Sequence, residues 1–323
     1  MQHASEGAEY GLNDLAGLTD GAKVSGNTSA TFHRAASILD DCEGALSWIR
    51  SSLPHKEQVL SDSGASVIFC DPQLEPPESL LETTCFIAVD NPKRQFARAV
   101  SQFFQPPRSA GIHPTALVHE EAVLGSNVSV GAFAVIEKVE IGHDCHIGAY
   151  SCIKHGSVLK DRVIIHEHVV IGSDGFGFVR GEDGRCEKFE HIGNTLLEDD
   201  VEIYPFCNVD RATLGTTRIK RGAKIDHYCH IGHNCEVGND SLLTAGVVLC
   251  GGAQVGDRCW LAVNTIVKEK AKVGNDVIVG FGGVVMKDVP DGETWAGSPA
   301  EEIRALAGRR GFLKRLHQQA THQ

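Results

Sequence analysis

Several features on which many proteins rely are scarce or missing in this sequence. The 323 residues include only four Tyr and three Trp, and no apolar run reaches the length of a membrane-spanning helix. None of the eleven cysteines belongs to a Cys-x-x-Cys pair, so we interpret them as small core or turn residues rather than metal ligands or disulfides. The net charge of −12 argues against binding to nucleic acid or to an anionic membrane surface. These absences predict a cytoplasmic protein without an integral membrane segment.

The sequence does contain an aliphatic residue at every sixth position over a long stretch. An α-helix needs apolar residues three and four apart, and a two-sided strand needs them two apart, so neither explains a period of six. Such a period is typical of stacked short coils, each of which buries its aliphatic residue only against its neighbours. The sequence therefore predicts a hexapeptide-repeat β-solenoid. The run comprises Ile219, Ile225, Ile231, Val237, Leu243, Leu249, Val255, Leu261, Val267, Val273, Val279 and Val285.

The same period opens earlier and is interrupted once. It runs from Ile112 to Ile136, slips by one residue, and resumes from Ile141 to Ile171. Between about residues 174 and 218 the register is lost, and an Asp-Gly-Phe-Gly motif that begins at Asp174 opens this segment. Loops of this length are uncommon unless they serve a function. We therefore predict a functional inserted loop at about 174–218, with a decorative surface insertion as the alternative.

Two further parts flank the repeats. Residues 1–108 lack the six-residue period and alternate helix-like with strand-like stretches, which predicts a small α/β domain. Within it, the apolar residues of the stretch 93–104 have the spacing of an amphipathic helix. Residues 109–290 form the predicted solenoid domain, and residues 291–323 a closing segment with a short basic helix. The chain is thus predicted to be mainly β with an N-terminal α/β domain.

The predicted C-terminal helix is interrupted by Gly308 and Gly311 and carries an excess of basic residues, among them Arg309 and Arg310. In an acidic chain this asymmetry favours contact with phosphate groups or with an acidic carrier protein. A solvated helix face is the equally simple alternative.

One of the sixteen histidines stands out by its place in the repeats. His233 follows Ile231-Gly232 near the middle of the second repeat run. Asp226 lies seven residues earlier, which we interpret as about one coil below His233. A carboxylate in that place could orient the imidazole and support its protonated form, as the base of an acyl transfer requires. For most other histidines an ordinary surface position is the simpler interpretation.

Four short motifs occur in an order and at a spacing that resemble those of a known family. They read Asp174-Gly175-Phe176-Gly177-Phe178, Val209-Asp210-Arg211, Lys224-Ile225-Asp226 and Ile231-Gly232-His233-Asn234. Together with Asn91-Pro92 before the amphipathic helix, they resemble the UDP-3-O-(3-hydroxyacyl)glucosamine N-acyltransferases of lipid A biosynthesis. The resemblance extends from about residue 60 to residue 300. The repeat alone is shared by many acyltransferases, whereas these motifs are far more specific.

The resemblance implies a left-handed parallel β-helix, a homotrimer, and active sites between neighbouring subunits. It implies that His233 deprotonates the amine of a nucleotide-linked sugar as that amine attacks an acyl thioester. Backbone N–H groups from glycines of an adjacent coil would hold the oxyanion. The thioester is a co-substrate, and no metal or redox cofactor is needed. The N-terminal domain would bind the uridine end through an aromatic residue, for which Trp48 is the matching candidate; a core position for Trp48 is the alternative.

The resemblance also implies further substrate contacts. Asp174, Phe176 and Gly177 belong to the first motif, and Asn234 stands beside the expected base. His230 occupies a position where the family commonly has Gln, three residues before that base. We expect all five residues to line the sugar site.

One departure from the family bears on the acyl donor. The family usually has Gly-His where this chain reads Lys268-Glu269-Lys270, so Lys270 replaces a second functional histidine. Lys268 and Lys270, with Arg309 and Arg310 of the tail, would suit the phosphates of a coenzyme A donor. The donor is therefore expected to be either acyl carrier protein or acyl-coenzyme A. A paralogue that acylates a nucleotide amino sugar for surface polysaccharide (O-antigen) from a short acyl-coenzyme A is a close alternative.

Two other classes of protein remain to be separated from this interpretation. A non-catalytic solenoid could act as a scaffold or a sugar-binding module, but it would need neither His233 nor the Asp-Gly-Phe-Gly loop. Zinc chemistry of the carbonic anhydrase kind also occurs on this fold and would need three histidines that converge across a subunit interface.

Overall fold

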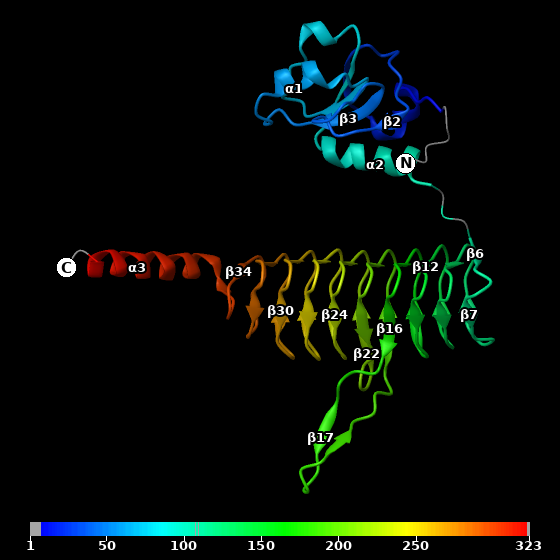
Figure 1. Cartoon of the computed structure of the whole chain (residues 1–323), viewed down its shortest axis with the longest axis vertical. Coiled ribbons are helices and arrows are strands. Elements are labelled where there is room, and N and C mark those ends of the chain that lie inside the picture. Colours follow the sequence, from blue (N-terminus) through cyan, green and yellow to red (C-terminus); the bar gives the residue numbers. More distant parts are fainter. Residues whose placement is uncertain (1–7, 107, 109, 322–323) are drawn as a thin grey trace. The chain divides into compact units, whose positions relative to one another are not determined.

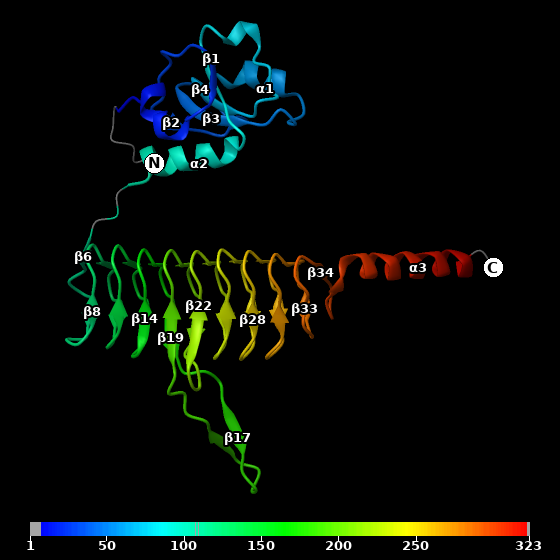
Figure 2. The same cartoon turned by 180° about the vertical axis from the view of Figure 1, so that it is seen from behind.

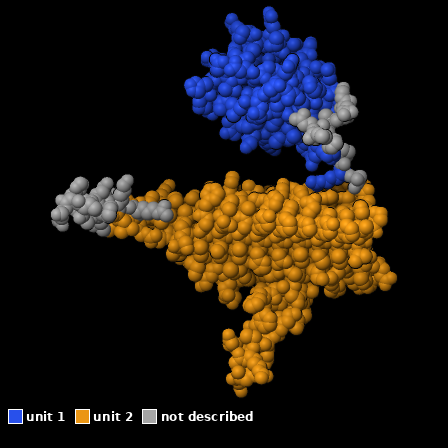
Figure 3. All heavy atoms as spheres, viewed as in Figure 1, with its two compact units in different colours: residues 1–108 blue, residues 109–323 orange. Residues whose placement is uncertain are grey.

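The computed structural model describes residues 8–106, 108 and 110–321, and the chain divides into two compact units, residues 1–108 and 109–323 (Figure 3). The first unit is an α/β domain whose five-stranded sheet has the order β1-β5-β4-β3-β2, with β1 antiparallel to β5 and the other neighbours parallel. Its elements are η1 (Leu12–Leu18), β1 (Lys23–Gly26), β2 (Arg34–Ala35), β3 (Ala45–Ile49), α1 (Lys56–Ser63), β4 (Val67–Cys70), η2 (Glu78–Leu80), β5 (Cys85–Ala88) and α2 (Pro92–Phe104).

Helix α2 begins where the sequence predicts an amphipathic helix. The Asn91 side chain accepts a hydrogen bond from the Arg94 N–H, which satisfies one of the free donors of the first turn. Pro92 fits the first turn because its missing N–H would have no partner there. The apolar face of α2 packs on the sheet, where Phe69, Ile87 and Ala99 are fully buried.

The second unit is a parallel β-solenoid, in which each coil gives one short strand to each of three sheets (Figures 1 and 2). The β23 sheet contains β6 (Gly111–Ile112), β9 (Ser129–Val130), β12 (His146–Ile147), β15 (Ile164–Ile165), β20 (Glu202–Ile203), β23 (Lys224–Ile225), β26 (Leu242–Leu243), β29 (Trp260–Leu261), β32 (Ile278–Val279), β34 (Thr294–Ala296) and β35 (Glu301–Glu302). The β24 sheet contains β7 (Leu117–Val118), β10 (Val135–Ile136), β13 (Cys152–Ile153), β16 (Val170–Ser173), β21 (Asn208–Asp210), β24 (His230–Ile231), β27 (Val248–Leu249), β30 (Ile266–Val267) and β33 (Val284–Val285). The β25 sheet contains β8 (Val123–Leu124), β11 (Glu140–Ile141), β14 (Ser157–Leu159), β19 (Asn194–Leu197), β22 (Thr216–Ile219), β25 (Glu236–Val237), β28 (Gln254–Val255) and β31 (Lys272–Val273).

The six-residue period has a simple origin in this arrangement. The aliphatic residue that ends each short strand points inward, and Ile231, Val237 and Leu249 are fully buried. Ile231 pairs with Leu249, so one complete coil takes 18 residues and crosses all three sheets. No coil encloses a core of its own, and each buries its aliphatic residues against the coils on either side. The predicted hexapeptide-repeat solenoid is confirmed.

An aromatic ladder runs along one edge of the solenoid, at the turns between the β23 sheet and the β24 sheet. Its rings are stacked with centroids 5.0 to 5.4 Å apart. All of its members have a positive φ, which bulky side chains rarely adopt. The ring contacts between coils offset this backbone strain, so the ladder helps to hold successive coils in register. The members are Phe133, Tyr150, His168, Phe206 and Tyr228.

Phe206→Asn is expected to destabilise the solenoid more than Phe133→Asn. Both residues are about half exposed and have a positive φ, which Asn tolerates, but Phe206 stacks on two rings and Phe133 on one. With roughly 0.5–1.5 kcal/mol for each ring pair, the loss in free energy of unfolding should be about twice as large for Phe206. Urea unfolding followed by circular dichroism measures it. Equal losses for the two variants would show that the stacking contributes nothing.

The inserted loop is shorter than the sequence predicted. The solenoid resumes at β19, which pairs with β14, so only about residues 174–193 leave the wall, and they carry the hairpin of β17 (Phe178–Arg180) and β18 (Cys186–Lys188). Figures 1 and 2 show this hairpin projecting from the row of coils. The prediction extended to residue 218 because the turn between β21 and β22 is long. This turn interrupts the six-residue spacing of aliphatic residues, although the chain continues the same coil into β22.

The C-terminal part also differs from its prediction. Strand β34 pairs with β32, so the solenoid continues past residue 290, where we had placed its end. Helix α3 (Ile303–Thr321) runs without a break through Gly308 and Gly311. An interior glycine costs a helix about 1 kcal/mol relative to alanine but removes no backbone hydrogen bond, so it need not end the helix. Among the described residues, no helix is long and apolar enough to cross a lipid bilayer.

Candidate active site

His233 lies in the turn that leads from β24 to β25 and is half-buried. Its Nδ1 is 3.1 Å from Asn234 Oδ1 and 3.3 Å from Thr213 Oγ1. Thr213 belongs to the long turn between β21 and β22, in the preceding coil. Groups from two successive coils therefore hold one nitrogen of this imidazole.

Asn234 determines which nitrogen of His233 carries the proton. The Asn234 Nδ2 donates to the Leu214 carbonyl at 2.8 Å, and the Asn234 Oδ1 accepts from the Thr213 N–H at 3.0 Å. The carboxamide cannot turn over without losing both hydrogen bonds, so its oxygen faces His233 Nδ1. Nδ1 must then be the donor, and Nε2 of the neutral ring is left with a free electron pair.

Nε2 of His233 points at a glycine of the next coil. A Cβ atom placed on Gly251 would stand 2.5 Å from Nε2, so only glycine leaves room for the ring. Gly251 lies in the turn after β27, and no described group accepts a hydrogen bond from its N–H. A basic nitrogen and a free backbone donor therefore lie next to each other. This arrangement suits a reaction that removes a proton and develops negative charge on an oxygen.

Within one chain, Asp226 does not pair with His233 as the spacing predicted. Asp226 Oδ1 lies 2.7 Å from His227 Nδ1 and accepts from the His227 N–H at 2.8 Å. Partial burial raises the pKa of Asp226, but the hydrogen bonds with His227 outweigh it and hold this pKa below its usual value. The physical reason for the error is the length of a coil. Seven residues carry the chain only from one turn to the next, whereas a neighbouring coil is 18 residues away.

The structure brings to this site a residue that we did not single out from the sequence. His191 lies near the end of the excursion and is only 5% exposed. Its ring centroid is 5.2 Å from that of His233, with the ring planes at 73°. A Cβ atom placed on Gly175 or on Gly177 would stand 2.8 Å from an atom of the His191 ring, so these glycines close over the imidazole. No repeat position marks His191, and its only sequence signal is that it lies in the excursion.

The other residues of the Asp-Gly-Phe-Gly motif have different surroundings. Asp174 Oδ2 accepts from Lys188 Nζ at 2.7 Å, and this bond holds the pKa of Asp174 below its usual value. Asp174 therefore ties the start of the excursion to β18. Phe176 is 86% exposed and contacts the ring of Phe178 at a centroid distance of 5.0 Å. Within this chain, the two glycines are the members of the motif that pack on His191.

His230 lies beside a buried carboxylate. Its Nε2 is 3.7 Å from Asp210 Oδ2, and its Nδ1 is 3.3 Å from Asn208 Nδ2. Asp210 is 4% exposed and accepts hydrogen bonds from Asn208 Nδ2 at 2.6 Å and from Ser173 Oγ at 3.0 Å. His230 is itself exposed, so its contact with a sugar stays a prediction.

Two of the predicted donor-binding residues lie on the same edge of the solenoid as His233. Lys268 and Lys270 are exposed in the turn after β30, and the Lys270 N–H donates to the Gly251 carbonyl at 3.1 Å. The lysines are therefore one coil beyond Gly251. Arg309 lies on α3 and pairs with Glu301 at 2.6 Å, and the Arg310 side chain lies outside the described residues.

Trp48 lies in the other unit, where it forms part of the wall of a cavity of about 450 Å³. It is half-buried on β3, and Phe96 of α2 contributes to the same cavity. The Arg50 guanidinium carbon is 5.7 Å and the Lys93 Nζ 6.0 Å from the centre of the indole ring. Trp48 thus combines an aromatic wall with nearby positive charge.

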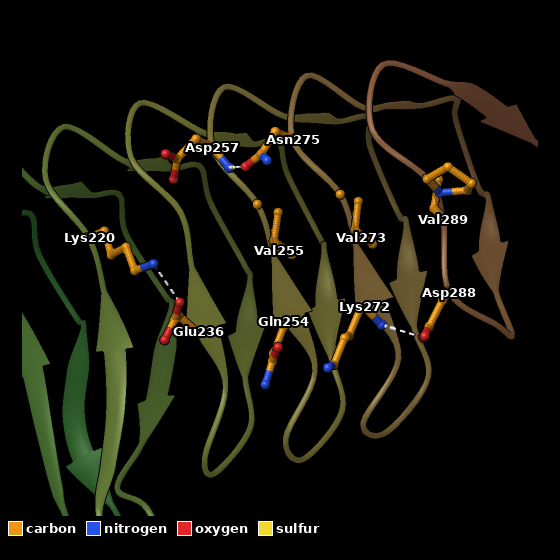
Figure 4. A pocket seen from close by; sticks show the side chains of 13 residues that line it. Lys220, Glu236, Gln254, Val255, Asp257, Lys272, Val273, Asn275, Asp288 and Val289 are labelled. Atoms are coloured by element: carbon orange, nitrogen blue, oxygen red, sulfur yellow. Dashed lines mark hydrogen bonds and ion pairs between the residues drawn. The ribbon is translucent and has the colours of Figure 1, made fainter.

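A second hollow of about 490 Å³ lies on the β25 sheet, in the coils that follow His233 (Figure 4). Gln254 and Lys272 point the same way along it, and Lys220 pairs with Glu236. Charges of both signs line this hollow, so it does not single out an anionic or a cationic ligand. Nowhere in the described part of the chain are three His, Cys, Asp or Glu side chains arranged to hold a metal ion.

Comparisons with known proteins agree with this architecture. Residues 138–173 and 216–251 match the family model described as bacterial transferase hexapeptide (six repeats). A UDP-3-O-acylglucosamine N-acyltransferase of Helicobacter hepaticus is 36% identical over 80% of this chain and 82% of its own length. One of Delftia acidovorans is 30% identical over 95% and 91%, respectively. A solved UDP-N-acetylglucosamine acyltransferase of Campylobacter jejuni shares the fold, with a TM-score of 0.52 and 22% identity over 59% of this chain and 73% of that chain.

The resemblance drawn from the four motifs is thereby confirmed, because the sequence identity extends over most of this chain and of its relatives. The repeats, the excursion and the edge that carries His233 lie within one solenoid. This chain belongs to the UDP-3-O-acylglucosamine N-acyltransferase family of hexapeptide-repeat acyltransferases.

Proposed function

We propose that this chain transfers an acyl group from a thioester to the amine of a UDP-linked 3-O-acylglucosamine, with His233 as the general base. The substrate class follows the names of its relatives. The observation that carries the proposal is the position of His233 Nε2 beside Gly251, whose N–H no described group accepts, with Asn234 holding the other ring nitrogen.

The reaction can be followed atom by atom on these groups. The amine nitrogen attacks the thioester carbonyl carbon while His233 Nε2 takes a proton from the amine. The carbonyl oxygen becomes an oxyanion, for which the Gly251 N–H, which no described group accepts, is the candidate donor. The C–S bond then breaks, and the leaving thiolate takes the proton back from His233. The products are an amide and a free thiol, and the base is regenerated.

The cavity at Trp48 suits the uridine end of the substrate. An indole wall offers a stacking face to a pyrimidine base. Arg50 and Lys93 stand close to that wall and can approach the diphosphate. We therefore assign the nucleotide end to the first unit and the acyl transfer to the solenoid.

Trp48→Ala is expected to raise KM for the UDP-sugar by about 5- to 100-fold, because base stacking on an aromatic side chain is worth roughly 1–3 kcal/mol. KM for the acyl donor should stay within about twofold, since the donor reacts at the solenoid. Trp48→Phe keeps an aromatic wall and is the matched control. If the alanine variant folds and binds the UDP-sugar as tightly as the native chain, the nucleotide does not bind in this cavity.

One observation favours a second candidate donor, acyl-coenzyme A. Lys268 and Lys270 are exposed and form no ion pair with any described residue, so they are available to the phosphates of a coenzyme. With such a donor the chain would act as the surface-polysaccharide type of N-acyltransferase on the same scaffold.

Thiol release with a 3-hydroxyacyl carrier protein and with acetyl-coenzyme A, each supplied with UDP-3-O-acylglucosamine, decides between the donors. Turnover with the carrier protein is the expected result. Turnover with acetyl-coenzyme A alone, with a KM that rises in Lys268→Ala and Lys270→Ala, would favour the second candidate. No thiol release with either donor would contradict acyl transfer to UDP-3-O-acylglucosamine.

A further inference from the structure

His191 has one imidazole nitrogen that the fold leaves without a partner. Its Nδ1 lies 3.0 Å from the Phe189 carbonyl oxygen, which can only accept, so Nδ1 carries the proton. Nε2 of the neutral ring is then an acceptor. It is buried, and among the described residues no group donates to it.

This nitrogen faces Gly175, beside the proposed base. A point built as the Cβ of Gly175 lies 2.8 Å from His191 Nε2 and 2.9 to 3.0 Å from Cβ and Cδ2 of His233. His191 Nε2 and the His233 side chain therefore both lie against Gly175, whose backbone occupies the space next to them. A donor group that took the place of this glycine would be within hydrogen-bond distance of His191 and in contact with His233.

Ring packing alone does not explain a histidine at this position. An apolar ring could make the same edge-to-face contact with His233 without burying an unsatisfied acceptor, which is unfavourable for folding. Buried polar atoms in native proteins are nearly always paired, so an unpaired one next to a reactive group calls for a partner. The partner expected there is the molecule on which His233 acts.

The segment that covers His191 is held by few side-chain contacts and by a backbone hydrogen bond from the Phe189 N–H to the Gly177 carbonyl at 2.9 Å. Gly175 and Gly177 contribute no side chains, and Phe176 between them is 86% exposed, with the ring of Phe178 as its aromatic neighbour. A small shift of these three residues uncovers Nε2 at little cost in side-chain contacts. The main cost of such a shift is the loss of the Phe189–Gly177 backbone hydrogen bond.

We propose that His191 binds the acceptor sugar. Its Nε2 accepts a hydrogen bond from an N–H or O–H of the amino sugar when the Gly175–Gly177 segment shifts, and this bond orients the amine toward His233. The proposal rests on the function proposed above and adds a specificity residue to it. It also assigns His191 to the sugar and not to the acyl donor.

Two variants separate the nitrogen from the ring. His191→Phe keeps a ring and loses the acceptor, whereas His191→Gln loses the ring and keeps an amide oxygen. Calorimetric titration of each with the UDP-linked amino sugar, in the absence of any thioester, gives the Kd without depending on turnover. We expect His191→Phe to weaken binding by about 3- to 10-fold, the worth of one neutral hydrogen bond, and His191→Gln to stay within about threefold of the native chain. KM for the acyl donor should not change in either variant.

Three results would overturn the proposal: native affinity in His191→Phe, equal losses in both variants, or a fall in kcat with sugar binding unchanged. The last would make His191 a positioning residue for His233. If His191→Phe does not give the native circular dichroism spectrum, the smaller apolar variant His191→Leu takes its place. His233→Ala is titrated and assayed alongside. If His233→Ala transfers acyl groups at the native rate, the proposed function fails. The Kd values of the His191 variants test the sugar contact separately, because they do not depend on turnover.

Discussion

His233→Ala is expected to lower kcat by about 10²- to 10⁴-fold, the usual contribution of a general base. KM for the UDP-sugar and for the donor should change by no more than a few fold, because the base acts on the amine mainly in the transition state. Steady-state thiol release under saturating conditions measures the effect. The variant should fold normally, since the half-buried imidazole fills no core position.

A matched control is available on the same solenoid. His143 is an exposed histidine in an early coil, where its Nδ1 lies 2.8 Å from Ser126 Oγ. His143→Ala should keep kcat within about threefold if the loss at His233 reflects catalysis rather than a general effect of removing an imidazole. A His233→Ala enzyme as fast as the control would rule out His233 as the base.

Asn234→Leu is expected to have the second largest effect, a fall in kcat of at least about 10-fold. Leucine is similar in size but cannot accept the proton of His233 Nδ1, so the ring can also adopt the tautomer with the proton on Nε2. Asn234 has a positive φ that leucine adopts only with strain, so a native circular dichroism spectrum is required of the variant. Binding of the UDP-sugar should change little if Asn234 acts through His233. An Asn234→Leu enzyme with native kcat would contradict the tautomer argument.

Asn234→Asp tests the tautomer argument through the pH dependence of kcat/KM, which a purely structural role of Asn234 would leave unchanged. The carboxylate still accepts from Nδ1, and its negative charge favours the protonated ring. The ring then stays protonated to higher pH, so the acid limb of the kcat/KM profile should move to higher pH. An unchanged profile with reduced activity would indicate only a disturbed turn, since Asp cannot donate to the Leu214 carbonyl as Asn does.

The sequence was a good guide wherever the repeat was regular. The inward positions of the second run, such as Ile231 and Val237, predicted the solenoid directly because each repeat buries the same position. The insertion was overestimated for a local reason. Leu197, Ile203 and Val209 are also six residues apart, but they are out of phase with the runs on either side, so their coil was taken for part of the loop.

The site could be predicted only in part. His233 follows a repeat position, and its motif is specific, so the sequence identified it. Asp226 was placed wrongly because adjacency between coils depends on an 18-residue step that a seven-residue spacing does not meet. His191 reaches the site through an irregular excursion, and nothing in the repeat indicates that its ring folds back onto His233.

The central claim is that the acyl group is transferred to an amine. Its most direct test is mass spectrometry of the product formed from UDP-3-O-acylglucosamine and a 3-hydroxyacyl carrier protein, before and after mild alkali. The product should gain the mass of one acyl group, and one acyl group should survive alkali, because an amide resists hydrolysis that removes the ester already present. A product that loses every acyl group in alkali, or no gain in mass at all, would contradict N-acyl transfer.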